Sequence, residues 1–200
     1  LGISITPIIT ALGVGGLAVA LALQDTLSNF FAGIQILITK QMRAGDFVRL
    51  DTGEEGYISD INWRNTSIKT TTNNVIVVPN SKLSTSKIIN YHLPDMEMNF
   101  NVTLGVSYNE NLENVEKVTI EVARKVLLEQ SSGAKNFEPL VRFHTFGSYD
   151  IQFNVVLRTN NVVDQHVLKH EFIKQLHARF KKEGIVIPYP IQTILSKKEI

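Results

Sequence analysis

The sequence predicts a membrane helix combined with an α+β soluble part, in which a small all-β domain precedes an α/β domain. Residues 7–24 (PIITALGVGGLAVALALQ) carry no charge and are rich in glycine and alanine. Short β-rich runs follow, and strands then alternate with two amphipathic helices. These three features divide the chain into residues 1–39, 40–92 and 93–200.

The apolar stretch has the length of a membrane helix. Its 18 residues would span about 27 Å, close to the hydrocarbon core of a bilayer. Thr6 and Pro7 predict an N-cap and a first helical residue. Asp25, the first charge in the chain, is expected at the water boundary, because a carboxylate inside the bilayer is costly. A secretory signal peptide is an alternative, since Ala-Val-Ala and Ala-Leu-Ala within residues 18–22 resemble cleavage sites.

A second helical segment is predicted from about residue 26 to 39. Asp25 can cap it, and Gly33 lies inside it at a cost of about 1 kcal/mol relative to alanine. Its apolar residues recur at helical spacing: Leu27, Phe30, Phe31, Ile34 and Leu37. The segment is predicted to be a bent, amphipathic continuation along the membrane surface, or alternatively a second packed core helix. Lys40 and Arg43 follow it directly, which places the rest of the chain in the cytoplasm by the positive-inside rule.

The membrane helix has two stripes of small residues on roughly opposite sides, at about 100° per residue. One stripe consists of Ala11, Gly15, Ala18 and Ala22, and the other of Gly13, Gly16 and Ala20. Small residues let neighbouring membrane helices pack closely, so two stripes predict two close neighbours. If the neighbours are copies of this helix, the head-to-tail contact closes into a ring. An ordinary pair of packed membrane helices is the alternative.

A ring of such helices has an inward flank. One flank carries Leu17 and Leu21 with Thr10 and Gln24, and the other carries only apolar residues. Thr10 and Gln24 favour the first flank as the inner one, because their polar groups are better placed toward water than toward lipid. Successive rings of Leu17 and Leu21 would form an apolar constriction that blocks ions by dewetting.

The rest of the chain reads as two domains joined near Leu93-Pro94-Asp95. The β domain has runs at residues 46–50, 55–63, 65–72 and 74–80, with turns at residues 51–53 and 73–74. The α/β domain follows in the order β-α-β-β-α-β, which matches a ferredoxin-like layer. Its predicted elements are strand 98–108, helix 112–129, a loop around 131–139, strands 140–146 and 149–159, helix 163–182 and strand 185–195. The last helix should bury Leu168, Phe172, Ile173, Leu176 and Phe180 and stop at Gly184.

The composition excludes several classes of function. Twenty basic and 19 acidic residues give a net charge of +1, which leaves no electrostatic footprint for nucleic acid. The chain has no cysteine, so thiolate catalysis and cysteine-ligated metals are excluded, and no catalytic or nucleotide-binding motif occurs. His166 and His170, with His177 further on, are better explained as solvated residues than as metal ligands. We therefore expect no enzyme activity, no cofactor and no metal. Because the first residue is Leu1, we also expect further membrane segments upstream.

Four motifs resemble the mechanosensitive channel of small conductance, the MscS family. They are LGVGGLAVALALQDTLSNFFAGI, RAGDFVRL, VIVVPNSKL with IINY, and GIVIPYP, in that order along the chain. The resemblance covers essentially all 200 residues. It implies a homoheptamer in the inner membrane that opens under tension, with a ring of Sm-like β domains and a cytoplasmic cage of α/β domains. It also implies that the C-terminal strands, around residues 191–195, assemble into a small barrel.

The resemblance assigns roles along the apolar helix. The two gate residues of the family fall on Leu17 and Leu21, and its packing residues fall on Gly13, Gly16, Ala18 and Ala22. The second bend of the family falls on Gly33, while Asp25 stands in place of the first hinge glycine and Ala20 in place of a packing glycine. The expected function is the release of ions and small osmolytes during hypo-osmotic shock, with membrane lipids and other copies of the chain as partners. A membrane-anchored or secreted α/β binding domain without a pore is the competing function.

Overall fold

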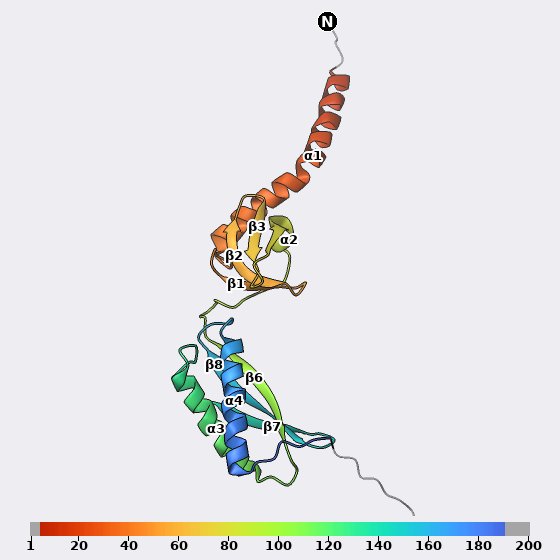
Figure 1. The fold of residues 1–200 in the computed structure, drawn as a ribbon. Coiled ribbons are helices and arrows are strands. Elements are labelled where there is room, and N and C mark those ends of the chain that lie inside the picture. The colour runs from red at the N-terminus through yellow and green to blue at the C-terminus, as the bar shows by residue number, and fades with distance from the viewer. Residues whose placement is uncertain (1–4, 191–200) are drawn as a thin grey trace, which may run out of the picture. The chain divides into compact units, whose positions relative to one another are not determined.

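The structure is a computed structural model that describes residues 5–190 (Figure 1). The chain divides into two compact units, Leu1–Pro94 and Asp95–Ile200. Each unit has its own apolar core. One long helix followed by a β domain and an α/β domain is the predicted fold class, and the structure confirms it.

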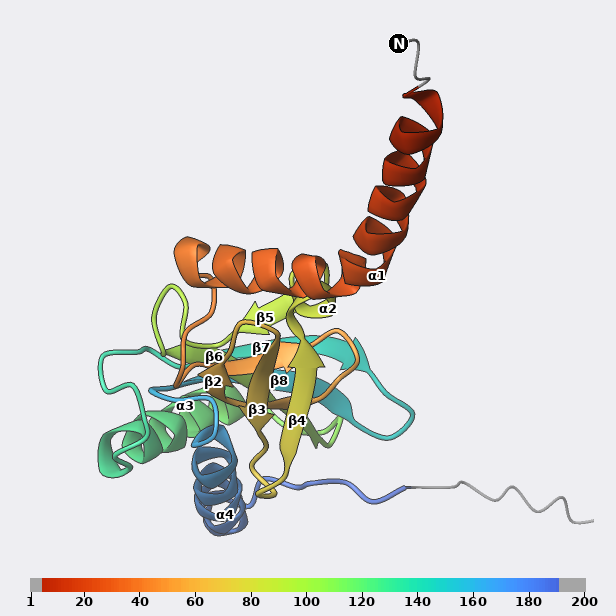
Figure 2. The same ribbon diagram turned by 90° about the horizontal axis from the view of Figure 1, so that it is seen from above.

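The first unit begins with helix α1, Thr6–Thr39, which is 34 residues long. It is one unbroken helix rather than a membrane helix followed by a separately capped segment. Thr6 is its first residue, so the predicted N-cap is wrong by one position, and Ile5 precedes the helix without a side-chain cap. Figure 2 shows that α1 bends where its colour passes from red to orange, so its two parts run in different directions. Lys40, in a left-handed conformation with φ 53°, ends the helix.

The β domain is an antiparallel sheet with the strand order β4-β3-β2-β1-β5. Its strands are β1 Phe47–Leu50, β2 Glu55–Ile61, β3 Asn65–Lys69, β4 Val75–Pro79 and β5 Ile88–Asn90. The predicted turns are confirmed by backbone conformation, since Gly53 and Asn73 have positive φ values of 98° and 69°. Between β4 and β5 lies a short helix, α2, Asn80–Leu83.

The core of this unit includes the second half of α1. Ile36 of α1 is buried in the same cluster as Met42, Val48, Ile58 and Leu83. On α1 the buried residues are Asn29, Ala32, Gly33 and Ile36, whose spacing puts them on one helical face. The apolar residues predicted for this segment, Leu27, Phe30, Phe31, Ile34 and Leu37, are exposed, so they do not form the buried face of a packed core helix, which was the alternative. The packed face of α1 is therefore the one that carries these four residues, and its small residues let the helix approach the β domain closely.

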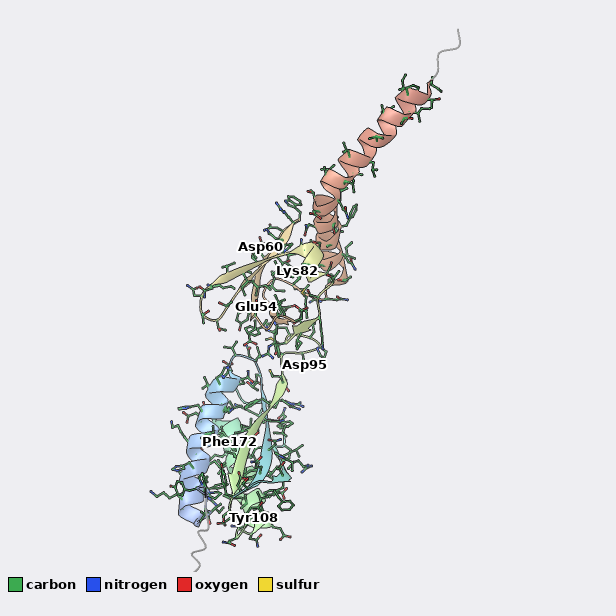
Figure 3. All side chains as sticks on the ribbon, turned by 90° about the vertical axis from the view of Figure 1, so that its right-hand side faces the viewer. Glu54, Asp60, Lys82, Asp95, Tyr108 and Phe172 are labelled. Atoms are coloured by element: carbon green, nitrogen blue, oxygen red, sulfur yellow. The ribbon has the colours of Figure 1, made fainter. Side chains whose placement is uncertain are left out.

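The second unit is a three-stranded antiparallel sheet with the order β6-β8-β7, packed against two helices. The elements are β6 Met98–Val106, α3 Leu112–Glu129, β7 Leu140–Phe146, β8 Ile151–Thr159 and α4 Gln165–Glu183. Alternate residues of β8 are buried, which gives the sheet one face toward the helices. Figure 3 shows Phe172 between α4 and the sheet, where it is fully buried.

Two predictions for this unit are wrong. Ile173 is 42% exposed, because it lies about 100° around α4 from the buried Phe172. The predicted final strand is not formed over residues 185–190, which have no regular secondary structure. Ile185 is buried, and Val186 accepts one hydrogen bond from the backbone N–H of Ser107 at 3.1 Å. The N–H of Val186 also donates to the carboxylate of Glu110 at 2.9 Å, and the N–H of Ile185 donates to the carbonyl of Phe180 at 2.9 Å. Side-chain burial and these hydrogen bonds hold the segment, and the predicted barrel residues 191–195 lie outside the described residues.

Candidate pore helix and its junction with the β domain

The first part of α1 makes no packing contact that buries a residue. Every residue from Ile5 to Ser28 is exposed, and the helix is long and apolar enough to cross a membrane. At about 1.5 Å per residue its 34 residues extend about 51 Å, well beyond the roughly 30 Å hydrocarbon core. Only part of α1 is therefore needed to span a bilayer.

The predicted gate residues lie on this exposed part. Leu17 and Leu21 are 61% and 62% exposed, and Gln24 is exposed as well. The hydroxyl of Thr10 donates a hydrogen bond to the carbonyl of Thr6 at 2.9 Å, so this polar group is satisfied within the helix. The structure brings none of these four residues into contact with another part of the described chain that would bury them.

The two stripes of small residues are likewise open. A Cβ added to Gly13, Gly15 or Gly16 would have no neighbouring atom within 4 Å. The alanines of the stripes, Ala11, Ala18, Ala20 and Ala22, are all exposed. Within residues 5–190, neither stripe is covered by another part of the chain.

Gly33 has the opposite environment. A Cβ placed on it would lie 2.6 Å from the Nδ2 atom of Asn80 and 3.0 Å from the backbone oxygen of Trp63. The second half of α1 thus touches the β domain at the turn between β2 and β3 and at the start of α2. A glycine is required here for close approach, whereas the helix itself continues through it.

Asn80 is the buried polar group at this contact. Its Nδ2 donates to the backbone oxygen of Asn62 at 2.7 Å, and its Oδ1 accepts from the hydroxyl of Thr66 at 2.9 Å. Its backbone N–H donates to the oxygen of Arg64 at 2.9 Å. Because both ends of the side-chain amide are satisfied, Asn80 has one fixed position beneath α1.

Asn29 is a functional candidate that the sequence reasoning missed. It is buried, and its Nδ2 donates to the backbone oxygen of Asp25 at 2.8 Å. Its Oδ1 accepts from the backbone N–H of Ser81 at 3.0 Å, which ties α1 to the first turn of α2. The available signal was an asparagine in an apolar helix, four residues after the only carboxylate of that helix.

Asp25 does not cap a helix in the structure, and the histidines are not grouped as metal ligands within the described residues. Asp25 contributes its backbone oxygen to Asn29, and its position lies inside α1 rather than at a helix end. Between residues 5 and 190, no three His, Cys, Asp or Glu side chains are grouped in a way that could hold a metal ion.

Two family models match consecutive parts of the chain. The mechanosensitive ion channel β-domain matches residues 25–93, and the C-terminal domain of the mechanosensitive ion channel MscS matches residues 100–187. The chain belongs to the MscS family.

Relatives extend the similarity through the apolar half of α1. The small-conductance mechanosensitive channel MscMJ of Methanocaldococcus jannaschii is 32% identical over 200 residues, which are 99% of this chain and 56% of the relative. The large-conductance channel MscMJLR of the same organism is 34% identical over 205 residues, which are 100% of this chain and 55% of the relative. The chain thus spans a little over half the length of these MscS-family relatives.

A solved structure has the same fold. The crystal structure of Helicobacter pylori MscS, described as its closed state, matches with a TM-score of 0.81 and 28% sequence identity. The match covers 99% of this chain and 76% of that chain. The single long helix and both MscS-family domains are therefore shared along nearly the whole described length.

Proposed function

We propose that this chain is the pore-forming part of a mechanosensitive channel that opens under membrane tension. In this proposal the full protein crosses the inner membrane several times. Copies of α1 form a ring there, and the family resemblance makes that ring a heptamer. The channel passes ions and small osmolytes with weak selectivity during hypo-osmotic shock. The β and α/β domains lie in the cytoplasm, on the side marked by Lys40 and Arg43.

One observation carries this proposal. An apolar helix with two open stripes of small residues is unburied over its whole first part, in a chain of a family of mechanosensitive channels. An exposed surface of this kind is unstable in water, so lipid and neighbouring helices must cover it. Small residues on two sides supply two helix contacts, and the flank between them carries Leu17 and Leu21.

The gate is the pair Leu17 and Leu21 in this proposal. Leucine side chains at successive turns narrow the pore and exclude water, and ions cannot pass a dry constriction. Thr10 and Gln24 lie on the same flank of the helix, with Thr10 before the leucine pair in the sequence and Gln24 after it.

The test is patch-clamp recording of Leu21→Ser, with Leu23→Ser as a matched control. Leu23 is also exposed, on the same helix, and lies about 160° around it from Leu21. A serine at position 21 hydrates the constriction in every copy at once, so the channel should open at clearly lower tension, while Leu23→Ser should change the threshold much less. Equal thresholds for the two variants would contradict the assignment of the inner flank.

The ring itself is tested by mass. Native mass spectrometry of the detergent-solubilised protein should give a closed oligomer of one size. A monomer or dimer would instead fit a membrane-anchored binding domain without a pore.

A further inference from the structure

One edge of β6, in the second unit, is open. Within residues 5–190, β6 pairs with β8 on one side and with no strand on the other. In a ferredoxin-like layer the last strand lies beside the first, so the segment after α4 is the expected partner of this edge. Figure 1 shows that the chain after α4 does not run back along β6. The backbone N–H and C=O groups of the open edge are therefore free to bond another strand.

One residue of the segment after α4 is nevertheless in position to pair. The C=O of Val186 accepts from the N–H of Ser107, the residue that directly follows β6, at 3.1 Å. The N–H of Val186 donates to the carboxylate of Glu110 at 2.9 Å, while the oxygen of Ser107 accepts from the backbone N–H of Glu110 at 3.1 Å. Val186 thus lies opposite Ser107 as an antiparallel partner does, with the carboxylate of Glu110 in place of the Ser107 oxygen. The pairing begins at this residue and stops after one bond.

Strand geometry explains why the pairing stops. In an antiparallel pair, residues that bond the neighbouring strand alternate with residues whose N–H and C=O point away from it. Val186 points both groups toward β6 and its following turn, so the next residues to do so are Pro188 and Pro190. Proline has no N–H, and both positions therefore lack the donor that the ladder needs. Tyr189, which lies between them, has an N–H, but it would point away from β6.

We propose that Pro188 and Pro190 keep the C-terminal segment from pairing with β6 and so select its partner. In the register set by Val186, a ladder would leave the carbonyl oxygens of Gly105 and Thr103 without donors. Residues 187–195 match the nine residues of β6 in number, yet they cannot complete the sheet. The segment stays available for association with other copies of the chain. The inference rests on the proposed ring, and it names the residues that decide between pairing within one chain and pairing between chains.

The first test restores the two missing donors. Pro188→Val combined with Pro190→Val supplies both N–H groups on a residue that favours strands. In the full chain in detergent, the segment should then pair with β6, and the N–H groups of Gly105 and Thr103 should donate to the carbonyls of residues 188 and 190. Two added hydrogen bonds correspond to about thirtyfold slower exchange of these two amides. Hydrogen exchange of the β6 peptide, followed by mass spectrometry, measures the change.

Tyr189→Val is the matched control for this test. It introduces the same residue into the same segment, but at a position whose N–H points away from β6. Tyr189 is 83% exposed, so its replacement removes no buried contact. Exchange in β6 should stay at the wild-type rate. Equal slowing in the control would show that strand propensity, rather than the missing N–H groups, decides the pairing.

A disulfide tests the register independently. The chain has no cysteine, so an introduced pair reports on one contact alone. When Val186 lies opposite Ser107, Gln192 falls opposite Asn101, and Cα atoms of such a pair are about 5.5 Å apart, within the range of a disulfide. Asn101→Cys with Gln192→Cys should form this bond in the double proline variant and not when both prolines are present. Mixing chains of ordinary and heavy-isotope mass separates a bond within one chain from a bond between copies.

The opposite results overturn the proposal. Slow exchange in wild-type β6, or a disulfide within one chain while both prolines are present, would show that the segment pairs with β6 despite them. Unchanged exchange and no disulfide in the double proline variant would show that the prolines do not hold the segment away. A disulfide only between copies would assign the β6 edge to a neighbouring chain. Oligomer mass and tension threshold of the wild-type protein are measured separately, so failure of this inference is distinguished from failure of the channel assignment.

Discussion

Gly33→Ala tests whether close packing or helix formation decides the role of this glycine. Within a helix, replacing glycine with alanine stabilises by about 1 kcal/mol. In this structure the new Cβ would lie 2.6 Å from Nδ2 of Asn80, nearer than an ordinary contact allows. The two effects have opposite signs, so the direction of the change in unfolding free energy separates them.

The packing term is the larger of the two. Asn80 cannot simply move away, because its Nδ2 is bonded to Asn62 and its Oδ1 to Thr66. Overfilling a packed site costs about 1–3 kcal/mol, and loss of a buried hydrogen bond adds about 1 kcal/mol. After subtraction of the helix term, Gly33→Ala should destabilise the first unit by about 1–3 kcal/mol, which corresponds to a lower Tm by roughly 5–20 °C for a domain of this size.

Fluorescence of Trp63 during thermal unfolding measures this change at the contact itself, since the backbone oxygen of Trp63 faces Gly33. Gly16→Ala is the control within the same helix. A Cβ on Gly16 meets no atom of this chain within 4 Å, so the first unit should keep its Tm. A higher Tm for Gly33→Ala would show that helix propensity dominates, and the close-packing argument would be refuted.

Two predictions concern the other contacts of α1. Ala20→Leu should leave the Tm of the first unit unchanged, because Ala20 is exposed in the chain, but it should reduce ring assembly or shift the tension threshold. Native mass spectrometry measures the assembly and patch-clamp recording measures the threshold. Wild-type results in both measurements would show that Ala20 does not lie at the ring contact. Asn29→Ala should lower the Tm of the first unit, because the half-buried N–H of Ser81 and the oxygen of Asp25 each lose a partner at a cost of about 1–3 kcal/mol in total. Asn29→Asp keeps an acceptor for Ser81 and should lose less, so an equal loss would contradict the role of the Ser81 bond.

The regular elements of the soluble part were predictable because local patterns determine them. Helix α3 begins after Asn111, whose side chain accepts from the N–H of Asn114, and the α4 helix ends at Gly184 in a left-handed conformation. The final strand was predicted from the apolar run 185–195, and residues 185–190 form none. Strand formation depends on a neighbouring edge, which an isolated sequence pattern does not contain.

The junction of α1 with the β domain was less predictable. The periodicity of Leu27, Phe31 and Ile34 predicts an amphipathic helix whose apolar face these residues form, and it does not predict that the opposite face packs against the β domain. That face was inconspicuous because Asn29 and Gly33 are poor markers of a core in sequence. Their role depends on partners about fifty residues away in the chain, at the start of α2.

The bend of α1 has a physical cause other than a flexible residue. Residues 17–32 contain neither glycine nor proline, and the helix is unbroken through Gly33. Helices also bend where a side chain joins the backbone hydrogen-bond ladder, as Asn29 does at the oxygen of Asp25. The same Asn29 side chain is held by Ser81, so the β domain fixes the direction of the second half of α1. We infer that movement of the first part of α1 relative to the β domain must strain the hydrogen bonds of Asn29. Asp25 takes part in this junction through its backbone oxygen, which accepts from Asn29.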